Sequence, residues 1–242
     1  MLSAAGSFLV RLLWPERCAA CLVGIPEGDV FCGDCEVTVL PLESACPGCA
    51  MPQTACAELC QACRMRPFPF RQAMAALLYG GAVAEALVRF KHGTQLAPAR
   101  PLGRCLVPLL DWGAVHGVDA VLPVPLHPAR LRARGFNQSL ELIREANAHR
   151  SARLPSRRLS VWTAALTRTR DTPPLGKESP AVRRSRVVGA FAADRSLVKG
   201  RRLLVIDDVM TSGATLAECA RTLLDAGAED VLVGAVARAM RA

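Results

Sequence analysis

Four C-x-x-C pairs constrain this chain more than any other feature of its sequence. Their first cysteines lie 14 residues apart, and nine of the 11 cysteines fall between Cys18 and Cys63. Two thiolates three positions apart on a tight turn can bind one ion, and tetrahedral zinc requires two such turns. The four pairs therefore predict two four-cysteine zinc sites, with the ligands Cys18, Cys21, Cys32, Cys35, Cys46, Cys49, Cys60 and Cys63.

The residues between the C-x-x-C turns indicate how the turns pair. Between the first two pairs, LVGIPEGDVF places a P-E-G-D turn between apolar flanks, which is typical of a β-hairpin. We therefore expect the first two pairs to bind one ion and the last two the other, although equal spacing also permits an interleaved arrangement. Cys56 is either a bystander or a ligand in place of Cys60. Four protein ligands leave no open position on zinc, so both sites are predicted to be structural.

The start of the chain and its cysteine usage bear on the compartment. The segment MLSAAGSFLVRLLW has no basic leading region and carries Arg11 inside its apolar stretch, so it predicts a short amphipathic helix rather than an export signal. No uncharged apolar stretch approaches the roughly 18 residues typical of a membrane span. A cytoplasmic protein is expected, in which paired cysteines hold metal more often than they form disulfides. A disulfide framework and a redox C-x-x-C motif are the alternatives.

Charge divides the chain into two parts. Residues 1–63 carry two basic and seven acidic side chains, whereas the remainder carries 28 basic and 14 acidic ones, and the formal net charge is +9. The segment RMRPFPF after Cys63 contains two prolines and has no apolar period, which is typical of a linker. We therefore predict a double zinc ribbon over residues 1–70, after the short N-terminal helix, and a second domain over residues 71–242.

The second part alternates between strand and helix patterns. Apolar runs predict strands over residues 73–79, 119–125, 162–168, 201–208 and 230–239, and helical periodicity predicts helices over residues 82–92, 101–113, 136–150 and 215–227. The polar, proline-containing stretch 169–185 has no apolar period and is predicted to be a mobile loop. Strands that alternate with helices predict an α/β domain built on a largely parallel sheet.

Two adjacent carboxylates end the most apolar of these strands. LLVIDD delivers Asp207 and Asp208 to the carboxyl end of the strand, where ligands of open α/β sheets gather. The loop from Thr211 to Thr215 has small and hydroxyl residues before a helix, and Gly213 lets its N–H groups close on an anion. That loop suits a phosphate, whereas the carboxylates suit sugar hydroxyls or a divalent cation. The pattern predicts a site for a sugar phosphate.

The run LLVIDDVMTSGAT resembles the PRPP motif of type I phosphoribosyltransferases. VLPVPLHPARLRARGFNQS, LVRFKHG and the four-knuckle head resemble the ComF competence-protein family, also called GntX-like, so that the resemblance covers nearly the whole chain. It implies a type I phosphoribosyltransferase-like parallel sheet with an N-terminal zinc-ribbon domain whose sites each have four cysteine ligands.

The resemblance also implies roles for individual residues. Asp207 and Asp208 would hold the ribose hydroxyls of PRPP and are the candidate catalytic residues. The PRPP 5-phosphate would lie on the loop residues Thr211, Ser212, Gly213, Ala214 and Thr215. The pyrophosphate, bridged by Mg²⁺, would be faced by Pro125, His127, Arg130, Arg134 and Lys91. His127 could equally be a loop histidine with a local partner. Residues 169–185 would form the lid that closes during transfer.

Two departures from the family pattern bear on catalysis. Thr211 stands where many purine-using members carry an acid, so no general base for a purine nitrogen is visible. In the lid pattern R-x-R-x-T-x-x-Q, Arg168, Arg170 and Thr172 match, but Leu175 stands at the glutamine position. The match therefore supports PRPP binding more strongly than it supports transfer.

The sequence favours two functions from different classes. The first is an enzyme that binds Mg-PRPP and transfers phosphoribosyl to an unidentified acceptor. The second is a non-catalytic PRPP-fold scaffold or sensor that binds single-stranded DNA and proteins of the DNA-uptake machinery, such as its helicase, which is the role that the family resemblance implies. Residues 130–202 carry 18 basic and five acidic side chains, which favours an anionic ligand. Only three aromatic residues accompany them, which is few for base stacking.

Overall fold

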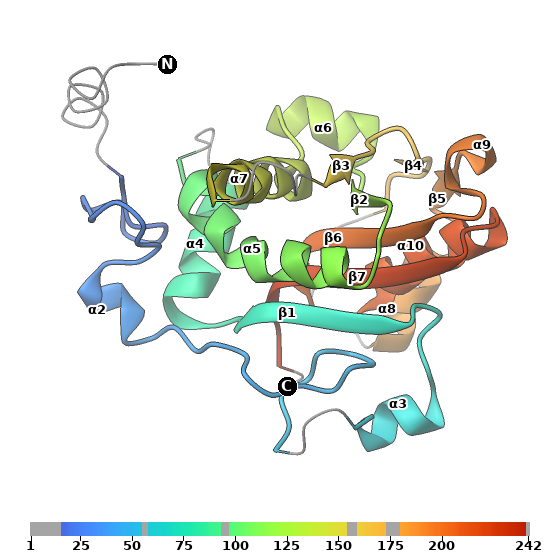
Figure 1. Ribbon diagram of the computed structural model, residues 1–242, viewed down its shortest axis with the longest axis horizontal. Coiled ribbons are helices and arrows are strands. Elements are labelled where there is room, and N and C mark those ends of the chain that lie inside the picture. The colour runs from blue at the N-terminus through green and yellow to red at the C-terminus, as the bar shows by residue number, and fades with distance from the viewer. Residues whose placement is uncertain (1–15, 55–57, 93–96, 154–158, 173–179, 241–242) are drawn as a thin grey trace.

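A five-stranded parallel sheet forms the centre of the computed structural model, which describes residues 16–54, 58–92, 97–153, 159–172 and 180–240. The strand order is β1 (Gln72–Leu78), β7 (Asp230–Arg238), β6 (Arg202–Met210), β2 (Ala120–Pro123) and β3 (Ser160–Val161), as Figure 1 shows. All four strand pairs are parallel, so the carboxyl ends of the strands share one edge of the sheet. The α/β fold predicted from the sequence is confirmed. The helix predicted at the N-terminus lies outside the described residues.

Strand β6 lies between β7 and β2 and carries the strongest apolar run. Leu203, Leu204, Val205 and Ile206 are fully buried. Because side chains alternate along a strand, Leu203 and Val205 pack into one core while Leu204 packs into the other. Both faces of β6 are thus covered, as expected for a strand with no polar face.

Helices cover the two faces of the sheet. Helices α4 (Gly81–His92), α5 (Ala99–Val115) and α7 (Gln138–Arg153) lie on one face, and α10 (Ala214–Asp225) lies on the other beside α8 (Pro180–Val187) (Figure 1). Helices α5 and α7 pack closely, because Gly103 has no side chain to separate them: a β-carbon there would lie 2.4 Å from Cβ of Glu145.

Within the strand predicted over residues 162–168, only residues 166–168 form a strand, and β3 of the main sheet ends before that segment at Val161, which corrects the prediction. Only β3 joins the main sheet, whereas β4 (Leu166–Arg168) pairs antiparallel with β5 (Phe191–Ala193), which precedes the short helix α9 (Arg195–Val198). Apolar periodicity does not show which partner a short strand takes. Helix α6 (Pro128–Arg134) also occupies a stretch predicted to be loop, and α8 begins inside the predicted mobile segment.

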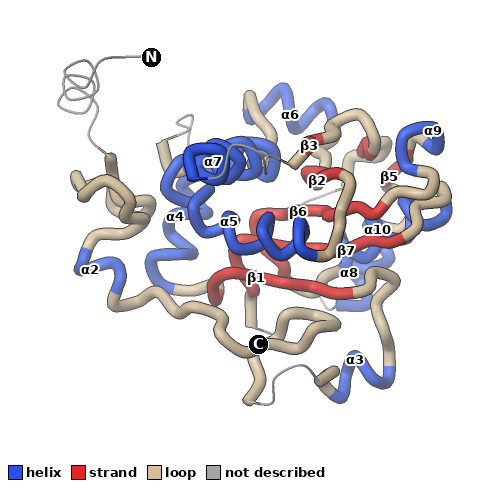
Figure 2. The backbone as a smooth tube through the Cα atoms, viewed as in Figure 1, coloured by secondary structure: helices blue, strands red, loops and turns tan. Residues whose placement is uncertain are grey.

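The cysteine-rich head is mostly loop, with the short helices α2 (Gly33–Glu36) and α3 (Gln61–Met65), and its second half runs beside β1 (Figure 2). Leu42 N–H donates to the Ala76 carbonyl at 2.9 Å, and Leu78 N–H donates to the Leu40 carbonyl at 2.8 Å. These bonds occupy the exposed edge of β1, which would otherwise be free to pair with another chain. Within the described residues, no helix has the length and apolar character needed to cross a membrane.

Candidate functional site

The Asp207 and Asp208 carboxylates lie near the carboxyl end of β6. Asp208 is buried and its Oδ2 lies 2.8 Å from Nζ of Lys91, which comes from α4. Asp207 is half-buried, and Ser139 at the start of α7 donates its hydroxyl to Asp207 Oδ1 at 3.4 Å. The two backbone N–H groups of Asp208 and Val209 also donate to the carboxylates of the preceding residues. The structure therefore brings together three of the predicted site residues, Lys91, Asp207 and Asp208.

The surroundings of Asp207 and Lys91 shift the pKa values of both side chains. Burial, and then the negative charge of Asp208, raise the pKa of Asp207 to about 7. Burial alone would lower the pKa of Lys91, but the Asp208 carboxylate outweighs it and raises that pKa. Two neighbouring carboxylates with one cation thus carry more negative charge than the site readily holds, which favours a ligand that brings hydroxyl donors or a cation.

The loop after β6 leads into the N-terminus of α10. Gly213 has φ of 77°, which is a left-handed conformation, and it is the N-cap of this twelve-residue helix. In the part of the chain that the structure describes, the N–H groups of Thr211, Ser212 and Gly213 donate no backbone hydrogen bond. The Ser212 hydroxyl accepts from Ala214 N–H at 3.4 Å. N–H groups at a helix N-terminus can bind anions, and residues 211–215, which the sequence predicts to bind phosphate, are called the phosphate loop below.

Sequence reasoning missed two residues that support this loop. The buried guanidinium of Arg238 donates to the carbonyls of Met210 and Thr211. Phe68 also packs against the loop, so that a β-carbon placed on Gly213 would lie 3.1 Å from Phe68 Cε1. A lone arginine inside the apolar strand DVLVGAVARA was the available signal for Arg238. No sequence signal marked Phe68, because its contact joins distant segments.

The β2–α6 connection carries the other predicted cations. His127 is the N-cap of α6, and its Nδ1 accepts from Ala129 N–H at 3.3 Å, so it has the local partner that the sequence left open. Burial and then repulsion by Arg130 lower the pKa of Arg134, while the Asp208 carboxylate opposes this shift. Arg134 is therefore electrostatically coupled to both Asp208 and Arg130.

The first described residues of the predicted lid are bound to Arg130. Its Nε lies 2.9 Å from Asp171 Oδ1, and its Nη2 donates to the Thr172 carbonyl. Arg168 donates to the Thr172 hydroxyl. Residues 173–179 of the predicted lid, including Leu175, lie outside the described residues. A carboxylate from the lid thus engages one of the cations predicted to face pyrophosphate.

A cleft of about 400 Å³ opens beside the β2–α6 connection, between α6, α7 and β4. Pro125 lines it, together with Leu131, Phe136 and Arg168. The predicted pyrophosphate residue Pro125 therefore borders a partly apolar hollow of small-molecule size.

The eight predicted cysteine ligands form two clusters. Cys18, Cys21, Cys32 and Cys35 make the first cluster, and Cys46, Cys49, Cys60 and Cys63 the second, with all Sγ atoms of a cluster within 4.8 Å of one another. Consecutive pairing is thereby confirmed, while Cys56 lies outside the described residues. A tetrahedral zinc with Zn–S bonds of about 2.3 Å separates its sulfurs by about 3.8 Å. The Cys21–Cys32 distance of 3.6 Å and the Cys49–Cys60 distance of 3.8 Å agree with such an ion.

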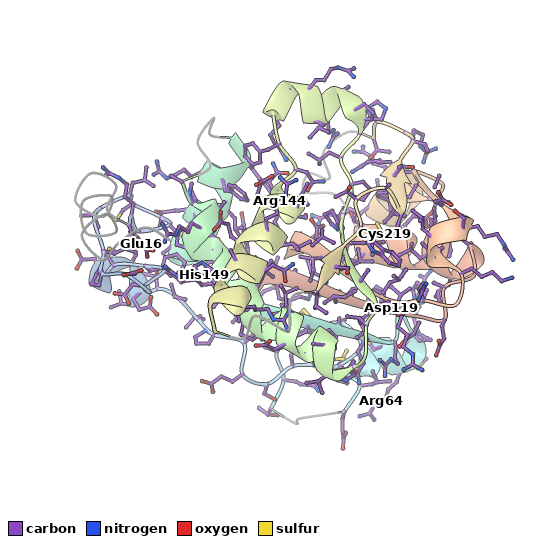
Figure 3. All side chains as sticks on the ribbon, turned by 45° about the horizontal axis from the view of Figure 1, so that its top comes forward. Glu16, Arg64, Asp119, Arg144, His149 and Cys219 are labelled. Carbon is purple, nitrogen blue, oxygen red and sulfur yellow. The ribbon has the colours of Figure 1, made fainter. Side chains whose placement is uncertain are left out.

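The two clusters dock at different places on the α/β part. Beside the first, Arg104 of α5 donates to the Asp29 carbonyl and to Glu16, each at 2.6 Å. Beside the second, Ala73 N–H of β1 donates to the Pro47 carbonyl at 2.7 Å. In Figure 3, Glu16 near the first cluster and Arg64 near the second are well separated on the molecule. Both clusters are compatible with structural zinc.

Comparison with known proteins agrees with this architecture. Residues 151–241 match the family model described as phosphoribosyl transferase domain. The chain is 29% identical over 231 residues to DNA utilization protein YhgH of Escherichia coli O6:H1, covering 93% of this chain and 98% of the relative. It is 31% identical over 163 residues to Competence protein F of Haemophilus influenzae, covering 62% of this chain and 66% of the relative. With Competence protein ComFC of Streptococcus pneumoniae the identity is 26% over 208 residues, covering 85% of this chain and 86% of the relative.

Two solved structures also match. They are an allosteric regulatory enzyme of purine biosynthesis and a glutamine phosphoribosylpyrophosphate amidotransferase from B. subtilis, each with a TM-score of 0.34 and with 20% and 19% identity. The match covers 56% of this chain but about a quarter of those longer chains, 25% and 26%. Together with the family model and the relatives, the two four-cysteine clusters and the parallel sheet confirm the predicted resemblance to the ComF family and the predicted fold class.

Proposed function

We propose that this relative of the ComF and YhgH proteins binds Mg-PRPP at the carboxyl end of β6 and transfers its phosphoribosyl group to an acceptor. The observation that carries the proposal is the pair of carboxylates, Asp207 and Asp208, near the end of a strand that leads into a loop at a helix N-terminus. In the described chain the first three N–H groups of that loop have no backbone acceptor. One half of that arrangement suits the hydroxyls of a sugar and the other half suits its phosphate.

In this proposal the phosphate loop binds the 5-phosphate. The N–H groups of Thr211, Ser212 and Gly213 donate to its oxygens, and the α10 dipole favours its negative charge. Ala214 N–H and the hydroxyls of Ser212 and Thr215 complete the donor set. Asp207 and Asp208 accept hydrogen bonds from the two ribose hydroxyls, which satisfies carboxylates that are otherwise crowded together.

The cations around the carboxylates position the leaving group. Arg130, Arg134 and Lys91 face the pyrophosphate, with Pro125 and His127 shaping the connection that carries it. Mg²⁺, when bound with PRPP, would supply positive charge that stabilises the negative charge developing on the pyrophosphate leaving group. During transfer the bond between ribose C1 and the pyrophosphate oxygen breaks, and a bond from the acceptor to C1 forms. Arg130 would exchange Asp171 for pyrophosphate as the ligand enters.

Titration calorimetry tests this proposal directly. The zinc-loaded full chain should bind PRPP in the presence of Mg²⁺, and the double variant Asp207→Ala with Asp208→Ala should lose that binding. Asp225→Ala is the control, because it removes a carboxylate at the far end of α10 that pairs with Arg221 on the exposed surface, away from β6. Absence of binding to the wild-type protein, or binding that survives the double substitution, would refute the proposal.

The second candidate function is the handling of single-stranded DNA by a scaffold or sensor with partners in the uptake machinery. The names of the relatives refer to competence and DNA utilization. Residues 130–202 are strongly basic, and one of their few aromatic rings, Trp162, lies 5.9 Å from the Arg201 guanidinium. A basic region of this kind would bind oligonucleotides with an affinity that falls steeply with salt, without PRPP turnover. Salt-insensitive or absent binding to an unstructured oligonucleotide would count against it.

A further inference from the structure

Arg238 is a fully buried charge at the end of β7, after the seven apolar residues 231–237. Its relative exposure is 0%, and its strand neighbours Val236 and Ala237 are buried as completely. A guanidinium remains protonated in a protein, so burial is tolerable only where several acceptors surround it. The hydrogen-bond partners of Arg238 therefore show which segments this side chain holds together.

The guanidinium joins three segments that are distant in sequence. Its Nε donates to the Cys49 carbonyl at 2.7 Å, which belongs to the second four-cysteine cluster. Its Nη1 donates to the Met210 carbonyl at 2.8 Å, to the Thr211 carbonyl, and to the Ala239 carbonyl at 2.6 Å. A planar fork of donors suits such divergent carbonyls better than the single ammonium of lysine does.

These bonds orient the phosphate loop. In a trans peptide the carbonyl and the N–H group point in opposite directions. When Arg238 holds the Met210 and Thr211 carbonyls, the N–H groups of Thr211 and Ser212 point away from it. These are two of the N–H groups that have no backbone acceptor in the described residues. Arg238 thereby keeps donors aimed at the space where a phosphate would bind.

The second four-cysteine cluster holds the carbonyl that accepts from Arg238 Nε. The turn that carries the Cys49 carbonyl is closed by Cys49 N–H and Ala50 N–H, which donate to the Cys46 carbonyl at 3.2 and 2.8 Å. Phe68, which follows this cluster in sequence, stacks on Phe70 with ring centres 4.8 Å apart and packs against Gly213. The first cluster contacts α4 and α5 instead, through Arg89 and Arg104.

We infer that Arg238 is a positioning residue for the phosphate loop and that the second four-cysteine cluster, but not the first, sets the affinity of this loop for a phosphomonoester. The inference rests on the proposed function of the loop as a phosphate site. It gives one zinc centre a role in ligand binding and leaves the other with a role in docking the head on α4 and α5.

Calorimetry with two probes tests the role of Arg238. Ribose 5-phosphate reports on the phosphate loop, and inorganic pyrophosphate with Mg²⁺ reports on the β2–α6 connection. Arg238→Met should weaken ribose 5-phosphate binding about tenfold or more, since it removes several charged hydrogen bonds, while pyrophosphate binding stays within about twofold. Arg238→Lys should restore part of the loss. Arg150→Met is the matched control, because Arg150 is also a buried arginine but pairs with Asp111 of α5.

The amide resonances of residues 211–214 in the ligand-free protein give a second readout. They should move in Arg238→Met and remain in place in Arg150→Met. Unchanged resonances together with unchanged ribose 5-phosphate affinity would overturn the inference. If the wild-type protein binds neither ribose 5-phosphate nor PRPP, the proposed function fails, and the resonances alone then decide whether Arg238 orders the loop.

Cysteine variants test the difference between the clusters. Cys46→Ser with Cys49→Ser should lose one zinc and most of the affinity for ribose 5-phosphate, whereas Cys18→Ser with Cys21→Ser should lose one zinc and keep the affinity. Equal losses from both pairs would contradict the assignment to the second cluster. If the second-cluster variant does not fold, Arg238→Met decides the question about the loop, because it keeps all eight cysteines.

Discussion

Replacing Asp207 by asparagine should make the ligand-free protein relatively more stable as the pH rises. Burial, and then the Asp208 carboxylate, raise the pKa of Asp207 from 3.8 to about 7 in the folded protein. Between these values the folded state binds a proton that the unfolded state has released, so the stability of the wild-type protein falls as the pH rises through this window. An asparagine does not ionise, so the variant lacks this loss.

The size of this stability change follows from the range of pH over which only the folded state holds the proton. One pH unit of pKa difference corresponds to about 1.4 kcal/mol, so the full effect between pH 5.5 and pH 7 is about 2 kcal/mol. Asp207 is only half-buried, so water screens the repulsion between the two carboxylates and reduces this effect. We therefore expect the stability difference to shift by about 1 kcal/mol in favour of Asp207→Asn between pH 5.5 and pH 8.

Urea unfolding of the zinc-loaded protein at several pH values measures this shift. The cysteine ligands also respond to pH, so the quantity compared is the difference between variant and wild type at the same pH. Asp225→Asn, on the exposed end of α10, should show no comparable slope. If the stability of the variant relative to the wild type is constant, or falls as the pH rises, the charged Asp207 carboxylate does not destabilise the folded protein and the reasoning is refuted. The same variant should bind Mg-PRPP more weakly than the wild type.

Three further predictions concern the phosphate loop, the lid and the metal. Gly213→Ala should destabilise the protein by about 1–3 kcal/mol in urea unfolding, because it combines a left-handed φ with a β-carbon only 2.9 Å from Met210 Cε. Gly200→Ala is the control, because Gly200 also has a positive φ but lies in open space, and it should destabilise the protein less. Asp171→Asn should tighten pyrophosphate binding several-fold in calorimetry, because it releases Arg130, and weaker binding would contradict the proposed exchange of partners. Metal analysis should find two zinc ions per chain, and a strong chelator should lower the unfolding midpoint; a chelated protein as stable as the loaded one would contradict structural zinc.

Local sequence pattern predicted much of the fold and of the site. The continuous apolar run of LLVIDD predicted a strand covered on both faces, and the structure has it between β7 and β2. The C-x-x-C spacing predicted both clusters, and the hairpin turn favoured the pairing that is found. These predictions succeed because their causes act within a few residues. The division into residues 1–70 and 71–242 stays a prediction.

Other features could not be read from local pattern. The segment 162–168 is apolar enough for a strand, but only residues 166–168 form one, and their partner β5 lies far along the chain. Helix α6 is short, and its first turn depends on the His127 cap and on Pro128 at its start. The contact of Asp171 with Arg130 joins residues 41 positions apart. These features depend on contacts that form only when the chain is folded, which a local sequence pattern does not reveal.

By itself, the sequence determined the chemistry: eight thiolates for two ions, adjacent carboxylates at the end of a buried strand, and a glycine-containing loop at a helix start. Spacing along the chain is sufficient for these features because the groups that cooperate are neighbours in sequence. Only the tertiary structure decided that the second cluster supports the phosphate loop through Arg238, while the first docks on α4 and α5. A buried guanidinium donates to the carbonyls that lie within about 3 Å of it in the folded protein, and here these carbonyls belong to segments far apart along the chain.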